Sequence, residues 1–166
     1  MPLPIALALL FAAAAGLDSS VVTFPGAQRE LPSPDSAFTI VWWEPDASNT
    51  GHSLLLKAAH SPKTWQVHSF QRSVSVSWAP SGHVFVVTDR VGSDSATTFA
   101  RNAETGTSVD VCAGPRRDLG ARWLGAHHRY CEQAGWTGGG GLVLRLWGYG
   151  EGVSFDTQVT VTLPKD

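Results

Sequence analysis

The stretch Ser73–Asp89, SVSVSWAPSGHVFVVTD, carries the clearest strand alternation in this chain. Over Ser73–Trp78 valine and tryptophan alternate with serine, the period of two expected of a half-buried strand whose serines face solvent. Ala79–Gly82 predicts a tight turn, because proline fixes one backbone angle and glycine tolerates a positive φ. The run His83–Thr88 predicts the returning strand. The stretch therefore predicts a β-hairpin.

Two other stretches carry a similar pattern. Ser33–Trp42, SPDSAFTIVW, also joins a proline-led turn to a β-branched, aromatic-rich run. Trp136–Trp147, WTGGGGLVLRLW, is a fainter third copy, in which Trp136 stands where Trp78 does. The near-continuous apolar run at Ala37–Trp43 favours a strand that is buried on both faces. The chain thus predicts a repeated turn-and-hairpin unit.

These segments resemble the strand-turn-strand core of β-propeller repeats of the TolB-like and WD-type kind, whose blades often carry a Trp-Ser-Pro-Asp-Gly turn before an apolar strand. The resemblance covers about half of the chain that follows the leader. Ser81 and Ser36 depart from it, since they stand where the repeat often has Asp and Gly, and no Trp-Asp dipeptide ends a strand.

The number of hairpins limits the architecture. A propeller typically closes with about four to eight blades, more than about three hairpins provide. Either the hairpins stack as a small open or sandwiched structure, or several chains complete a ring. We expect the first, because a ring needs a long hydrophobic edge that the sequence does not announce. The predicted fold class is all-β, a small antiparallel hairpin or sandwich-like domain with propeller-blade-like sheets.

Further strands are predicted by pattern and turn signals. His52–Ala58 is expected to pair with Thr64–Phe70, and Ala96–Ala100 with Ser108–Cys112. The segment Asp118–Leu124 is compatible with either a short helix or a loop. A strand is predicted after it, at Tyr130–Trp136. Val153–Leu163 is the predicted last strand, with Phe155, Val159, Val161 and Leu163 facing inward.

The N-terminus predicts export. Residues 1–16 are apolar and end in small residues, as in a secretory signal peptide, although no Lys or Arg precedes the apolar run. An uncleaved anchor is the alternative, but the run is shorter than the roughly 20 residues that span a membrane. We therefore expect a periplasmic or extracellular protein without stable membrane insertion after cleavage. Residues 17–35 are predicted to form an extended leader, with an edge strand through Val21–Phe24 as an option, and residues 36–166 a single β domain.

Charge and cysteine content restrict the partners. Twelve Lys and Arg against 14 Asp and Glu give a formal net charge of −2, without the basic patch that nucleic acid requires. Cys112 and Cys131, the only two cysteines, predict one disulfide in an oxidising compartment. His127 and His128 beside Cys131 are weak candidates for metal ligands, and we expect neither a metal site nor a cofactor.

No enzyme motif is recognised in the sequence. A Ser-His-Asp system is conceivable with His68 or another histidine as the base and Asp89 or Asp94 as its partner, but no nucleophile elbow marks a serine. A metal-dependent or serine hydrolase is therefore disfavoured. The expected function is non-enzymatic.

The seven tryptophans say more about a possible binding surface than the candidate catalytic residues do. Trp42, Trp78 and Trp136 are expected in the core. The candidate binding residues border polar loops and are Trp43, Trp65, Trp147 and Tyr149, the last two in the glycine-rich segment Trp147–Gly152. The chain is interpreted as a protein-interaction module whose partner is an unknown protein or glycan. A hydrolase inhibitor or carbohydrate binder using exposed aromatic residues is the alternative.

Overall fold

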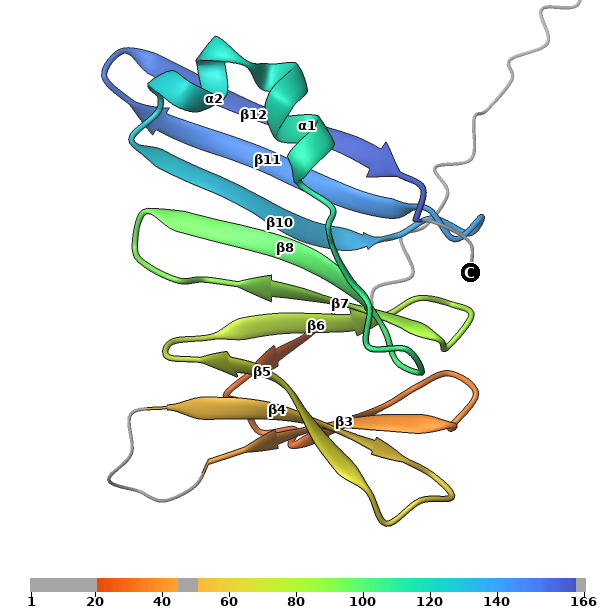
Figure 1. The fold of residues 1–166 in the computed structure, drawn as a ribbon. Helices are drawn as coiled ribbons and strands as arrows, with labels where there is room; N and C mark the ends of the chain where they lie inside the picture. Colours follow the sequence, from red (N-terminus) through yellow and green to blue (C-terminus); the bar gives the residue numbers. More distant parts are fainter. Residues whose placement is uncertain (1–20, 45–50, 164–166) are drawn as a thin grey trace, which may run out of the picture.

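A computed structural model describes residues 21–44 and 51–163 (Figure 1). The chain is mainly β, as predicted, with two short helices, α1 (Ala113–Leu119) and α2 (Ala121–Gly125). The strands are β1 (Val22–Phe24), β2 (Glu30–Pro32), β3 (Phe38–Trp43), β4 (His52–Ala58), β5 (Thr64–Phe70), β6 (Val74–Trp78), β7 (Val84–Asp89), β8 (Ser95–Asn102), β9 (Ser108–Asp110), β10 (His128–Trp136), β11 (Leu142–Gly150) and β12 (Val153–Val161).

The described strands form two sheets. The smaller has the order β2-β3-β4-β5, and the larger has the order β1-β6-β7-β8-β10-β11-β12 with β9 beside β8. Every pairing is antiparallel except β8 with β10, which are parallel over only two residue pairs. Figure 1 shows three groups of strands one above another, which we call the lower layer (β2–β5), the middle layer (β1 and β6–β9) and the upper layer (β10–β12).

The lower and middle layers contain turns with the same backbone hydrogen bonds. In the lower layer the Ser33 amide donates to the Phe38 carbonyl at 2.8 Å and the Ser36 amide to the Ser33 carbonyl at 2.9 Å. In the middle layer the Ala79 amide donates to the Val84 carbonyl at 2.8 Å, and the Gly82 amide donates to the Ala79 carbonyl at 2.9 Å. The predicted hairpin and its earlier copy therefore share one turn geometry.

The turn between β10 and β11, in the upper layer, is one residue shorter than these two turns. The Thr137 amide donates to the Gly141 carbonyl at 2.8 Å, and the Gly140 amide to the Thr137 carbonyl at 2.9 Å. The first two turns also touch each other: Gly82, at φ +82°, lies so close to Asp35 that a Cβ atom would be 2.8 Å from the carboxyl carbon. The absence of a side chain at this glycine thus allows the lower and middle turns to stack.

A tryptophan links each layer to the one before it. Trp78 precedes the middle turn, and its indole N–H donates at 3.0 Å to the carbonyl of Leu31, two residues before the lower turn. Trp136 precedes the upper turn, and its indole N–H donates at 2.9 Å to the hydroxyl of Ser77, two residues before the middle turn. The same contact therefore recurs along the stack, with a backbone acceptor in one case and a side-chain acceptor in the other.

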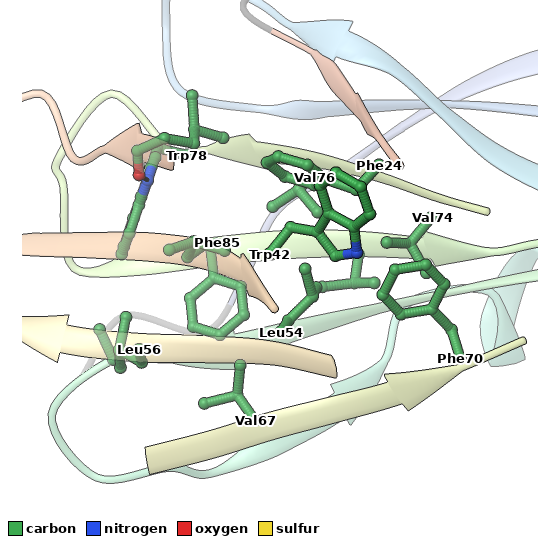
Figure 2. Close-up of a cluster of buried hydrophobic side chains, with 14 residues drawn as sticks. Phe24, Trp42, Leu54, Leu56, Val67, Phe70, Val74, Val76, Trp78 and Phe85 are labelled. Atoms are coloured by element: carbon green, nitrogen blue, oxygen red, sulfur yellow. Dashed lines mark hydrogen bonds between the residues drawn. The ribbon is translucent and has the colours of Figure 1, made fainter. Parts of the chain in front are cut away.

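The interface between the lower and middle layers is apolar. Figure 2 shows Trp42, Leu54 and Phe85 among the buried side chains of this cluster, all at most 9% exposed. The expectation that Ala37–Trp43 is buried on both faces is wrong. In β3 the side chains of Ile40 and Trp42 are buried, whereas the alternating positions face outward, because no layer of the described residues covers that side.

The interface between the middle and upper layers is partly polar. The predicted solvent face of β6 is wrong, since Ser75 and Ser77 are buried beneath β10. The Ser77 hydroxyl donates to the Gln133 side-chain carbonyl at 2.5 Å, and the Gln133 side-chain amide donates to the Ser75 carbonyl at 2.5 Å. The Gln133 backbone amide donates to the Thr88 hydroxyl at 3.0 Å. Serines on β6 therefore mark a polar interface between layers instead of a surface.

The segment between β9 and β10 forms the two helices, which agrees with the helical alternative over Asp118–Leu124. Gly120, at φ +51°, separates them and donates to the last carbonyls of α1. The helices lie against the upper layer in Figure 1, where the Trp123 ring packs 5.9 Å from that of Phe155. Among the described residues, no helix has both the length and the apolar character needed to span a bilayer.

Several expectations concern the N-terminal part. The segment proposed as a signal peptide, residues 1–16, lies outside the described residues, as does the start of the leader. The rest of the leader contains two strands, of which β1 extends the larger sheet beside β6 and β2 begins the smaller sheet beside β3. The strand β2 was not predicted.

Candidate binding face

The outer side of the upper layer carries four aromatic side chains. Register places His128 opposite Tyr149 and Tyr130 opposite Trp147, so these residues share one face of β10 and β11. We call this set, His128, Tyr130, Trp147 and Tyr149, the aromatic face. It contains two of the four candidate binding residues.

The four rings form a nearly parallel set. Tyr130 and Trp147 stack with ring centroids 4.0 Å apart, and His128 and Tyr149 stack at 4.4 Å. Trp147 and Tyr149, two residues apart on β11, have their centroids 6.2 Å apart and their planes within 17°. Tyr149 is 46% exposed, whereas Tyr130 is buried at the inner end of the set. The stacking fixes ring orientations before any partner arrives.

Charged groups surround the rings. The Trp147 indole N–H donates to Glu132 at 3.0 Å, and the Arg90 guanidinium holds the other oxygen of that carboxylate at 3.0 Å. The Arg145 guanidinium lies 5.5 Å from the Trp147 ring centroid and donates two hydrogen bonds, at 2.9 and 2.6 Å, to Asp156 on β12. The tryptophan is therefore held by an anion at its edge and a cation over its ring.

The ionisation of these groups follows from their contacts. The hydrogen bonds to Asp156 raise the pKa of Arg145 above its usual value, and the same bonds lower the pKa of Asp156. Burial raises the pKa of Tyr130, with a further contribution from Tyr149. The phenol of Tyr130 donates to the Ser93 carbonyl at 2.5 Å, which requires its neutral form. The Arg145–Asp156 pair beside the rings is therefore charged at neutral pH, and Tyr130 is neutral.

The glycine-rich segment builds this face as a regular strand. Trp147–Gly150 is the end of β11, and only Glu151 and Gly152 form the turn to β12. A Cβ on Gly148 would lie 2.5 Å from the His128 carbonyl and 2.8 Å from the Phe155 ring. Glycine at this position lets β10 and Phe155 approach while its neighbours point to the opposite face.

Trp43 and Trp65 lie elsewhere, in the lower layer. Trp43 is 46% exposed at the end of β3, opposite Ser53. Trp65 is 44% exposed at the start of β5 and borders a cavity of about 250 Å³ that Leu56 and Arg101 also line. The structure brings neither tryptophan to the aromatic face. The sequence reasoning did not select Tyr130 and Arg145, which the period of two along β10 and β11 could have indicated.

The candidate metal ligands have other partners. Cys112 and Cys131 form the predicted disulfide, so neither is a free thiolate. His127 pairs with Glu151 at 2.9 Å, and His128 belongs to the aromatic face. Within residues 21–44 and 51–163, no group of three or more potential metal ligands is found.

One of the conceivable catalytic pairs is present. The His68 ring nitrogen Nε2 lies 2.6 Å from the Asp89 carboxylate, which joins β5 to β7. The imidazole packs against Phe70 and Phe99, with centroids 6.4 and 5.0 Å away. This pair fastens the lower layer to the middle layer at the margin of their apolar core.

Comparison with known proteins adds no family to this description. No protein-family model matches the chain, and no curated protein matches its sequence.

Proposed function

We propose that this chain is an exported, non-enzymatic protein-interaction module that binds its partner through the aromatic face. One observation carries the proposal: Arg145, Trp147 and Tyr149 lie together on one face of β11, where Arg145 and Tyr149 are exposed and Trp147 is half-buried. Tryptophan, tyrosine and arginine are the residue types most enriched where protein interfaces gain their binding energy. Their stacked arrangement reduces the side-chain entropy that binding would otherwise remove.

The stacking favours a protein partner over a glycan. A sugar ring binds best to an open aromatic face. Here Trp147 covers Tyr130 and Tyr149 covers His128, at 4.0 and 4.4 Å, so much of the ring-face area is already occupied. The exposed groups are the Tyr149 side chain and the Arg145–Asp156 pair, while Trp147 is half-buried. Such a mixture of aromatic and charged groups suits a protein surface.

Export is the other part of the proposal. The disulfide between Cys112 and Cys131 supports it, because such bonds persist in oxidising compartments and are rare in the cytosol. The apolar stretch at residues 1–16 is the sequence feature that favours a secretory route. The proposed partner is therefore a protein of the periplasm or the extracellular space.

Site-specific photo-crosslinking in an exporting host tests the contact surface. A photoreactive phenylalanine analogue would replace Tyr149 in one variant and Trp43 in a matched control, since both side chains are 46% exposed. We expect a discrete protein adduct from position 149 that the control does not form. Loss of this adduct in a Trp147→Ala background would tie it to the aromatic face.

Two outcomes would contradict the proposal. One is the absence of any adduct at position 149 while the variant is exported and folded. The other is an identical adduct pattern at positions 149 and 43, which would indicate contacts made at random. Exclusive labelling of glycan by the position 149 variant would favour the carbohydrate alternative.

A further inference from the structure

The strand β12 is the outer strand of the larger sheet and offers a long open edge. It pairs with β11 over nine residue pairs, from Val153 opposite Gly150 to Val161 opposite Leu142, without a register shift. No other described strand pairs with it. Its outer backbone N–H and C=O groups are therefore arranged to receive another strand.

The other outer strands are short or irregular. The strands β1, β2 and β9 contain three residues each, and β2 includes Pro32. The strand β5 pairs with β4 through a register irregularity between Leu54 and Leu55. Proline, lysine, bulges and short length are the usual protections of sheet edges, and β12 has none of them.

The edge of β12 is accessible beside α1. A cavity of about 220 Å³ lies between this helix and the strand, lined by Pro115, Leu119, Val159 and Val161 among others. The two valines are half-buried and pack at the margin of the upper core. A strand added to β12 would cover their exposed parts and enter this cavity.

The charge of β12 also suits association. Asp156 is its only charged residue, and Arg145 of the adjacent strand neutralises it through two hydrogen bonds. An inward or unpaired charge would discourage pairing, whereas this carboxylate is already compensated.

We propose that the occupant of this edge is a second copy of the chain, whose β12 pairs antiparallel with the first about a two-fold axis at Thr157. This register uses all nine residues and places Thr157 opposite itself, Asp156 opposite Gln158, and Val153 opposite Val161. No like charges face each other directly, and the Gln158 amide can donate to the carboxylate across the pair. The strand is thus self-complementary, as an isologous interface requires.

The geometry has a consequence for binding. Antiparallel pairing about an axis perpendicular to the sheet keeps equivalent faces on the same side. The two aromatic faces would therefore lie on one side of a continuous sheet, and both pairs of helices on the other. If the aromatic face binds a partner, the dimer presents it twice, which raises apparent affinity for a repeated or dimeric target. The self-association itself does not depend on that proposed function.

Charge substitutions at Thr157 give a decisive test, because this residue faces its own copy. The variants Thr157→Lys and Thr157→Glu would each place like charges opposite one another, and we expect the dissociation constant to rise about tenfold or more. With one of the two variants uniformly labelled with 15N so that their masses differ, an equimolar mixture should form the heterodimer, which native mass spectrometry then distinguishes from either homodimer. Thr157→Ser is the matched control, since it changes the same position without adding a charge and should leave the dimer in place.

The measurements are sedimentation velocity over the micromolar range and native mass spectrometry of the protein purified from an exporting host. Circular dichroism melts of each variant verify folding. A wild type that stays monomeric over this range overturns the proposal. So do homodimers that persist in both charge variants, which would place the interface elsewhere, and a mixture of folded variants that forms no heterodimer.

Discussion

The interface between the lower and middle layers and the interface between the middle and upper layers repeat one turn-and-tryptophan contact, yet they differ in chemistry. The first is filled by aliphatic and aromatic side chains such as Ile40, Leu54 and Phe85. The second combines an apolar cluster with a buried network of Ser77, Gln133 and their hydrogen-bond partners.

The difference shows how one repeated backbone can carry two kinds of specificity. Apolar packing is non-directional and depends mainly on volume. A buried amide is directional, because each unpaired donor or acceptor is penalised once water is excluded. The middle–upper interface is therefore expected to fix the relative position of its layers more strictly than the lower–middle interface does.

The largest effect is expected from a cavity in the lower–middle interface. Leu54 is fully buried, and Leu54→Ala should lower the free energy of unfolding by about 2–5 kcal/mol, through lost burial and the void left behind. Urea denaturation measures this change. The control is Leu55→Ala at the neighbouring, half-exposed position on the outer face, where the loss should be clearly smaller. Equal losses at the two positions would contradict the assignment of the inner face.

Removal of the disulfide is expected to come next. Cys112 and Cys131 are 19 residues apart, and closing a loop of this length stabilises a protein by about 3 kcal/mol in the chain-entropy model. Cys112→Ser should therefore lower stability by a similar amount under oxidising conditions. Reductant should shift the wild-type denaturation curve and leave that of the variant unchanged. A variant as stable as the oxidised wild type would refute this expectation.

The polar network distinguishes the two interfaces most directly. Trp136→Phe removes the indole donor to Ser77, and Trp78→Phe removes the donor to the Leu31 carbonyl. A buried polar group left without its hydrogen-bond partner lowers the free energy of unfolding by about 1–3 kcal/mol. Both should destabilise, but Trp136→Phe more, because the Ser77 hydroxyl also donates to Gln133, and losing one bond of a buried hydrogen-bond chain weakens the others.

A double-mutant cycle sharpens this result. Ser77→Ala and Gln133→Leu should be coupled, so that the double variant loses less than the sum of the singles. Additive losses would show that the network does not act as a unit.

The smallest expected effect concerns acid. The hydroxyl of Ser33 and the amide of Ala37 donate to Asp35 at 2.6 and 3.0 Å and lower the pKa of Asp35 below its ordinary value of 3.8. The folded state therefore favours the carboxylate, and this contribution is present above the ordinary pKa and is lost as pH falls through the lower, folded value.

Asp35→Asn should thus be slightly less stable than the wild type at neutral pH, and the difference should vanish in acid. Denaturation midpoints measured across this pH range test it, with Ser33→Ala as a second variant that removes the main donor. A difference that persists unchanged in acid would exclude this cause. The upper turn uses the neutral hydroxyl of Thr137 as its acceptor and should show no such response.

Local pattern predicted most strands but not the order of the layers. The turn at Ala79–Gly82, its copy at Ser33 and the pairing of β8 with β9 follow from nearby residues, and the structure confirms them. The sequence predicts burial of both faces for β3 and of one face for β6, whereas the structure buries one face of β3 and both faces of β6. Periodicity cannot reveal that Gln133 and Trp136 cover the serines of β6.

The candidate site shows the same limit. Exposed aromatic residues at Trp147 and Tyr149 were selected from sequence, but their stacking with Tyr130 and His128 depends on the register of β10 against β11. The resemblance to propeller repeats remains a prediction.

The disulfide has one more consequence, for proteolysis. Cys112 and Cys131 flank the whole segment that contains α1 and α2, in which the side chains of Arg117 and Asp118 are about 80% exposed. A protease that cuts after Arg117 would leave the two parts of the chain covalently joined. Such nicked protein would migrate as one species on a non-reducing gel and separate into two fragments only after reduction.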